Sequence, residues 1–213
     1  MRIFKSNFYS LLVTFVVFSV SANAQKGPLN CEDFNIRMSV AEYFRPKDTN
    51  QAYLELKDGS KIYSDTITTK LGRKVKDQIK AGDKIFKMKD TRGYYAGGNY
   101  YGFYSMYGNI YVKRFIQGKI NLYFSEHNGN FPTTDSKGHT REYYSAFCNH
   151  YYQIGDSTEL VMFQTFEDIK KLVKDCPKSL AMINKDIKEI RQAIKENPAY
   201  LNEVFTVYNN GCK

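Results

Sequence analysis

The sequence predicts an α+β protein in which an antiparallel β-sheet is followed by a helical end. Turn signals separate short runs of alternating apolar and polar residues, and the helical period begins only near residue 165. With 213 residues, 42% of them hydrophobic and 25% charged, the chain suits one ordinary folded domain. We therefore expect residues 25–163 to form a sheet curled into a roll or half-barrel, and residues 164–213 to pack on it as three helices.

The first 24 residues have the pattern of an export signal peptide. Arg2 and Lys5 precede an apolar core from Leu11 to Val20, and Ala22-Asn23-Ala24 supplies small residues for cleavage. The core is too short for a membrane span, and a buried N-terminal helix is the alternative. Cleavage would leave a chain that begins at Gln25, with 29 basic and 22 acidic residues and a formal charge of +7. We expect a periplasmic or secreted protein.

The strand-rich part contains two hairpin candidates and several further strands. Leu54 and Leu56 alternate with charged residues before Asp58-Gly59, a pair typical of a type I′ turn. Residues 111–124 are the second candidate, with Gln117-Gly118 between two alternating runs. We expect further strands at 84–89, 142–147, 150–154 and 159–163.

From Thr165 onward the apolar residues follow the helical period. Thr165 and Asp168 have the spacing of a capping box, Pro177 suits the first turn of a second helix, and Asn197-Pro198 opens a third that ends at Gly211. The expected buried faces are Phe166, Ile169, Leu172 and Val173, then Leu180, Ile183, Ile187, Ile190 and Ile194, then Leu201, Val204, Phe205 and Tyr208.

All four cysteines follow the export signal, where an even number of cysteines favours disulfides. If the second and third helices run antiparallel, Cys212 returns close to Cys176, and Cys31 then pairs with Cys148 by elimination. Free thiols are the alternative. No Cys or His spacing matches a zinc site, so we expect no metal and no cofactor.

Positive charge is concentrated between Lys70 and Arg92, where nine cations stand against three acids. Such a field attracts anionic polysaccharide, lipopolysaccharide or other anionic surfaces, with nucleic acid a less favoured partner. We select Arg73, Lys74 and Lys76 as ligand-binding candidates. The alternative is that these cations only prevent sheet edges from pairing.

Immediately downstream, the segment Gly93 to Gly108 holds six Tyr, one Phe and five Gly in sixteen residues. Tyrosine combines a flat apolar ring with a polar tip, which suits sugar rings, stacked bases or an envelope protein. The alternative is a Tyr-rich loop or edge strand that covers the sheet. The binding candidates are Tyr94, Tyr95, Tyr100, Tyr101 and Tyr104.

Catalytic patterns are weak. His127, His139 and His150 match no metal motif by their spacing, and the stretch 127–141 is expected to be an exposed loop. Glu126 and Asp135 could join the histidines around a divalent ion, but any loop of this composition offers such a set. The motifs of serine hydrolases, phosphate-binding loops and zinc proteases are absent from the sequence. We therefore favour a non-enzymatic binding or structural module with a basic, Tyr-rich contact surface. The alternative is a secreted hydrolase that acts on envelope polymer through the His127–His150 region.

Two motifs, FIQGKINLY and KLVKDCP…YNNGC, follow the Asp-Gly hairpin in the chain. In this order they resemble a group of small exported proteins of Gram-negative bacteria to which no activity is assigned. The resemblance implies a place in the bacterial envelope and a sheet followed by helices. It brings no catalytic or binding residues, and the Gly/Tyr segment and Cys148 have no place in its pattern.

Overall fold

The structure is a computed structural model that describes residues 28–34, 51–69, 77–106, 108–134, 140–155 and 159–212. The expected export signal and residues 70–76 lie outside these ranges, as do the side chains of residues 126–147. The strands are β1 Tyr53–Leu56, β2 Lys61–Tyr63, β3 Ile67–Thr68, β4 Gln78–Ala81, β5 Lys84–Lys87, β6 Thr91–Ala96, β7 Asn99–Tyr104, β8 Ile110–Ile116, β9 Ile120–Thr134, β10 Thr140–Ile154 and β11 Val161–Phe163. The helices are α3 Phe166–Leu172, α4 Pro177–Ile183, α5 Ile187–Glu196 and α6 Tyr200–Asn209, with short 3-10 helices η1 Cys31–Phe34 and η2 Met88–Asp90.

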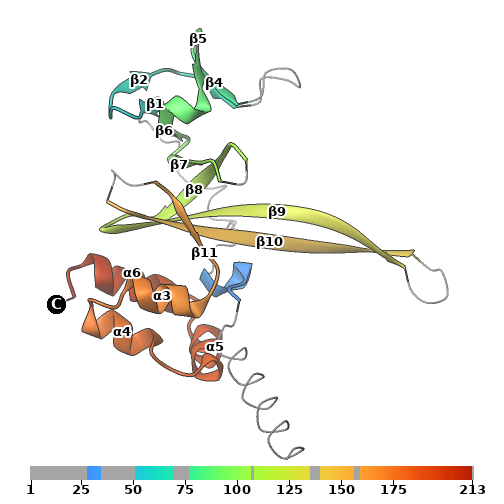
Figure 1. The fold of residues 1–213 in the computed structure, drawn as a ribbon, viewed down its shortest axis with the longest axis vertical. Coiled ribbons are helices and arrows are strands. Elements are labelled where there is room, and N and C mark those ends of the chain that lie inside the picture. The colour runs from blue at the N-terminus through green and yellow to red at the C-terminus, as the bar shows by residue number, and fades with distance from the viewer. Residues whose placement is uncertain are drawn as a thin grey trace, which may run out of the picture.

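The α+β class is confirmed. Eight strands form an antiparallel sheet in the order β11-β10-β9-β8-β7-β6-β1-β2, and β3, β4 and β5 form a second, smaller sheet. The large sheet lies between the second sheet and the helices along the long axis of the molecule (Figure 1). It is open, with β11 and β2 as its two edges, so the expected roll or half-barrel is not confirmed.

The first expected hairpin, β1 with β2, is present, but its turn differs from the expected one. Gly59 has a φ of 87°, its N–H donates to the Leu56 carbonyl at 3.0 Å, and the Leu56 N–H donates to the Ser60 carbonyl at 2.9 Å. This is a three-residue loop with a glycine bulge, and it replaces the expected type I′ turn. Gly97 and Gly98, with φ of 57° and 78°, supply the two positive φ angles of a type I′ turn between β6 and β7. The Gly/Tyr segment is therefore a hairpin in the middle of the sheet.

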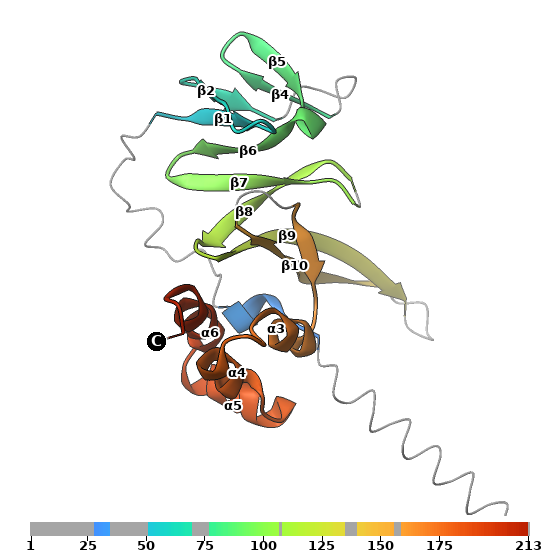
Figure 2. The same ribbon diagram turned by 60° about the vertical axis from the view of Figure 1, so that its left-hand side comes forward.

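Strands β9 and β10 extend beyond the rest of the sheet as a long hairpin (Figure 2). Strand β8 pairs with β9 no further than Phe124, whereas β10 pairs with β9 as far as Thr134. The expectation of an exposed loop over 127–141 is wrong for most of its backbone, which belongs to β9 and to the start of β10.

The two faces of the large sheet have different surroundings. On one face, Leu54 packs with Ile79 and Met88 of the second sheet and η2. Further along the same face, Leu122 and Phe163 form a core with the helices. Because side chains alternate along a strand, the residues between these lie on the opposite face. We call the first the covered face and the second the open face, since neither the helices nor the second sheet pack on the latter.

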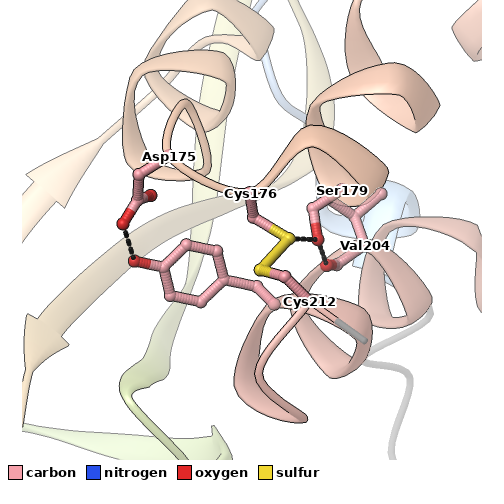
Figure 3. The surroundings of a disulfide bond; sticks show 6 residues. Asp175, Cys176, Ser179, Val204 and Cys212 are labelled. Atoms are coloured by element: carbon pink, nitrogen blue, oxygen red, sulfur yellow. Dashed lines mark hydrogen bonds between the residues drawn. A yellow bond between two sulfur atoms is a disulfide. The ribbon is translucent and has the colours of Figure 1, made fainter.

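Both expected disulfides are present. Cys31 is joined to Cys148, which ties the N-terminal segment to the sheet, and Cys176 is joined to Cys212. The Ser179 hydroxyl donates to the Val204 carbonyl at 2.9 Å and lies 3.2 Å from the Cys176 sulfur, so α4 and α6 are linked beside the disulfide (Figure 3). The Cys176–Cys212 disulfide joins the start of α4 to the end of α6, two helices that lie side by side, as the sequence predicts.

The expected second helix is two helices in the structure, so four α-helices are described where three were expected. Asp186 and Glu189 form a capping box that begins α5 after a break at 184–185. The capping box at Thr165 is confirmed, and none of the helices in the described ranges is long and apolar enough to cross a membrane. Asn209 attaches α6 to the sheet by hydrogen bonds with both backbone groups of Ile120, at 2.9 and 3.1 Å.

Candidate functional site

Four tyrosines lie in one line across the open face. The register pairs Tyr63 with Tyr53, Tyr53 with Tyr95, and Tyr95 with Tyr100, so the line crosses β2, β1, β6 and β7. Tyr53 and Tyr95 stack with ring centroids 5.5 Å apart, and Tyr63 meets Tyr53 edge-on at 5.8 Å. We call these four residues the tyrosine row. Because Tyr53 stacks on Tyr95, and cations lie over the rings of Tyr53 and Tyr100, the row offers a ligand mainly ring edges and hydroxyl tips.

A polar pocket of about 160 Å³ adjoins the row, and we call it the row pocket. Its lining comes from strands β1, β2, β7, β8 and β10 together with the residue after β8. A water molecule in the liquid has a share of about 30 Å³, so the pocket has room for one small polar group or ring. The lining residues are Tyr53, Glu55, Lys61, Tyr100, Arg114, Gln117 and Gln153.

Two glycines make the space that the rings of this site occupy. The Tyr100 hydroxyl on β7 donates to Glu55 on β1 at 2.8 Å, although β6 lies between these strands. A Cβ on Gly93 would lie 2.7 Å from the Tyr100 hydroxyl and 2.3 Å from a backbone oxygen. Only glycine at this position therefore lets the Tyr100 side chain pass over β6 to reach Glu55. Gly102, the partner of Gly93, likewise lies beneath the ring of Tyr123.

Burial raises the pKa of Tyr100 above its ordinary value, and the negative charge of Glu55 raises it further. The phenol therefore stays protonated at neutral pH and donates a hydrogen bond to the Glu55 carboxylate. Nearby, the Tyr123 hydroxyl donates to the Gln153 side-chain oxygen at 2.7 Å. These two hydrogen bonds fix the orientation of the aromatic and amide groups that line the row pocket.

The row pocket contains two cations held against aromatic rings. The Arg114 guanidinium lies 4.5 Å from the centroid of Tyr100 and donates to the Gln117 side-chain oxygen at 3.0 Å. The Lys61 ammonium lies 4.4 Å from the centroid of Tyr53. Within the described ranges, no ion pair joins either cation to a carboxylate. The arrangement favours a ligand with negative charge.

A second, larger pocket of about 380 Å³ lies beside the first, and Gln153 lines both. It combines aromatic and aliphatic side chains with charged ones, and its volume falls within the usual range of small-molecule sites. Its lining residues are Lys57, Thr91, Arg92, Phe103, Tyr104, Ser105, Met106, Gln153, Glu159 and Leu160.

Strand alternation separates the five tyrosines selected from the sequence. Tyr95 and Tyr100 belong to the tyrosine row, and Tyr104 is buried where it lines the second pocket. Tyr94 and Tyr101 stack on each other at 4.7 Å on the covered face, where burial raises the pKa of Tyr94 to about 12. The five therefore do not form one continuous platform.

The basic stretch selected from the sequence is described only in part. Arg73, Lys74 and Lys76 fall outside the described residues. Downstream of them, Lys84 and Lys87 are exposed on β5 of the second sheet. That sheet packs on the covered face, opposite the face that carries the row pocket.

The row pocket also contains residues that were not selected from the sequence. In the first hairpin, the alternation of Tyr53 and Glu55 with the apolar Leu54 and Leu56 was a usable signal. Arg114 and Gln153 carried no such signal, because only the sheet order brings them to the same pocket.

His150, the histidine whose side chain is described, is buried in the core. It is 1% exposed, with its ring centroid 4.9 Å from that of Phe34 and 5.7 Å from that of Phe163. Burial lowers its pKa to about 4, and its Nε2 has no hydrogen-bond partner. The side chains of His127, His139, Glu126 and Asp135 lie outside the description. Among the described residues, no group of three His, Cys, Asp or Glu is placed to hold a metal ion.

No protein-family model, curated protein or solved structure matches this chain. A functional proposal therefore rests on the residues of the open face.

Proposed function

We propose that this protein is a non-enzymatic binding module of the bacterial envelope whose open sheet face binds a glycan. The observation that carries the proposal is the tyrosine row together with the row pocket. Hydroxyl, amide and cationic groups gather there on the one face of the large sheet that neither the helices nor the second sheet cover. Such groups suit a hydroxyl-rich ligand, because each ligand hydroxyl both donates and accepts hydrogen bonds.

The geometry of the row favours an extended ligand. Four strands spaced about 4.8 Å apart give the row a length of roughly 14 Å. Tyr63 at its outer end is 59% exposed, so the row continues to the edge of the sheet. A polymer chain that lies across the strands would contact several hydroxyl tips at once, and its affinity would come from several weak hydrogen bonds.

The proposed location agrees with such a partner. Two disulfides are typical of proteins in an oxidising compartment. The N-terminal export pattern would deliver the chain to the periplasm or the medium. There, acidic polysaccharide and lipopolysaccharide are the hydroxyl-rich polymers that we propose as partners.

The test is binding of the disulfide-intact chain to immobilised acidic polysaccharide and lipopolysaccharide. The double variant Tyr53→Phe/Tyr63→Phe removes two hydroxyl groups and keeps both rings. If each hydroxyl contributes about 0.7 kcal/mol, we expect roughly tenfold weaker binding.

The control is Lys84→Gln/Lys87→Gln on the second sheet, which should leave affinity within about twofold at physiological salt because screening limits distant charges. Unchanged binding of the tyrosine variant, with loss in the lysine variant, would contradict the proposal.

A further inference from the structure

We infer that the row pocket is a subsite for one anionic group of the glycan, the carboxylate or sulfate of an acidic sugar, with Arg114 and Lys61 as its recognition residues. The inference rests on the proposed function and adds the charge of the ligand and the atoms that recognise it. It is carried by three properties of the pocket: an oriented guanidinium, an excess of positive charge, and a small polar volume.

Arg114 is the oriented group. Its guanidinium lies against the ring of Tyr100 and is tethered by the hydrogen bond to Gln117, so two contacts fix its plane. A guanidinium has five N–H donors, and its described hydrogen bonds use one of them. The remaining donors form the fork that matches two oxygens of a carboxylate or sulfate.

Lys61 and Glu55 set the charge balance. The pocket lining contains two cations and one carboxylate, and that carboxylate accepts the hydrogen bond from Tyr100. No ion pair within 4.0 Å joins Glu55 to Lys61 or Arg114 in the described structure. An incoming anion therefore meets one net positive charge and does not have to displace an existing ion pair.

The size and polarity of the pocket limit what enters it. About 160 Å³ accommodates one charged substituent or one ring, and the lining residues all carry polar tips. The rest of an acidic polymer would continue along the tyrosine row. The pocket thus distinguishes acidic from neutral glycans, while the row supplies contacts that both kinds share.

The experiment measures equilibrium binding of the disulfide-intact chain to polygalacturonate, dextran sulfate and neutral dextran at low and at physiological salt. The test variant is Arg114→Gln. The matched control is Lys113→Gln, which makes the same charge change one residue earlier, on the covered face. We expect Arg114→Gln to weaken binding of a charged polymer at least tenfold and to reduce its salt dependence, with binding of dextran unchanged. Lys113→Gln should weaken binding of the charged polymer by less than threefold.

The outcomes separate the two proposals. Preference for polygalacturonate over dextran sulfate would assign the subsite to carboxylate, and the reverse preference would assign it to sulfate. Equal binding of charged and neutral polymers by the wild type, or equal losses in the two variants, would overturn the subsite and leave the glycan-binding proposal standing. Failure of the wild type to bind any of the three polymers would overturn both.

Discussion

The two faces of the large sheet use the same kinds of residue for different purposes. On the covered face, Tyr94 packs against the cluster around Leu54 and stacks on Tyr101. Tyr95 and Tyr100, one position away in each strand, join the tyrosine row on the open face. On the covered face the rings fill volume, whereas on the open face they hold cations and orient hydrogen bonds. Between β6 and the start of β7, a one-residue step along a strand therefore decides whether a tyrosine lies on the covered face or in the tyrosine row. Further along the open face, Tyr104, Tyr123 and Tyr151 form a buried cluster of their own.

This comparison also explains the role of glycine in the Gly/Tyr segment, residues 93–108. Gly93 and Gly102 face each other across β6 and β7. Gly93 provides space for the ring of Tyr100 on the adjacent strand, and Gly102 provides space for the ring of Tyr123 on β9, two strands away. The Gly/Tyr composition is therefore a packing pattern on the open face, in which small residues let large ones cross the sheet.

The largest expected effect is on the covered face. Leu54 is 0% exposed between the two sheets, so Leu54→Ala should lower the free energy of unfolding by about 2–5 kcal/mol through lost burial and an unfilled cavity. Its neighbour on the open face gives the control: Tyr53→Phe keeps the ring stack and should change stability by less than about 1 kcal/mol. Urea denaturation monitored by circular dichroism measures both. Similar losses in the two variants would mean that the faces are not distinct.

A smaller effect is expected from pH at the helical end of the covered face. The pKa of His150 is lowered to about 4 in the folded protein, so on acidification the unfolded chain binds this proton first. The contribution to stability is complete above the ordinary pKa of 6.5, falls as the pH drops toward 4, and is lost below it. The loss would amount to about 3 kcal/mol at most.

The matching variant is His150→Leu, which cannot take up a proton. Unfolding free energies measured at several pH values between 7 and 4 should fall less steeply in this variant than in the wild type. Equal slopes would mean that His150 is solvated and protonated in the folded state.

The sequence predicted the parts of the fold that depend on local signals. The capping box at Thr165 and the helix start at Pro177 were expected because each signal lies within a few residues of its effect. The Cys176–Cys212 pairing spans 36 residues and was expected because these local helix signals imply two antiparallel helices. The break before α5 also had a local signal, Asp186 with Glu189, but the continuous apolar spacing of the isoleucines around it concealed the break.

The row pocket depends on non-local order and was therefore only partly predicted. Tyr100 was selected because its segment is rich in tyrosine, yet its hydrogen-bond partner Glu55 lies two strands away in the sheet. Arg114 and Gln153 reach the same pocket from β8 and β10 through the register of the whole sheet. Alternation predicts which residues share a face of one strand, but the neighbours across strands follow from the sheet order.

The central claim, that the open face binds the ligand, is tested most directly by two adjacent tyrosines. Tyr100→Phe removes a hydroxyl from the open face, and Tyr101→Phe removes one from the covered face. Binding to polygalacturonate, measured by isothermal titration at one salt concentration, should weaken about fivefold to tenfold for Tyr100→Phe, because loss of the hydrogen bond to Glu55 releases a ring that orients Arg114. Tyr101→Phe should bind as the wild type does. Weaker binding by Tyr101→Phe, with Tyr100→Phe unchanged, would contradict the assignment of the open face.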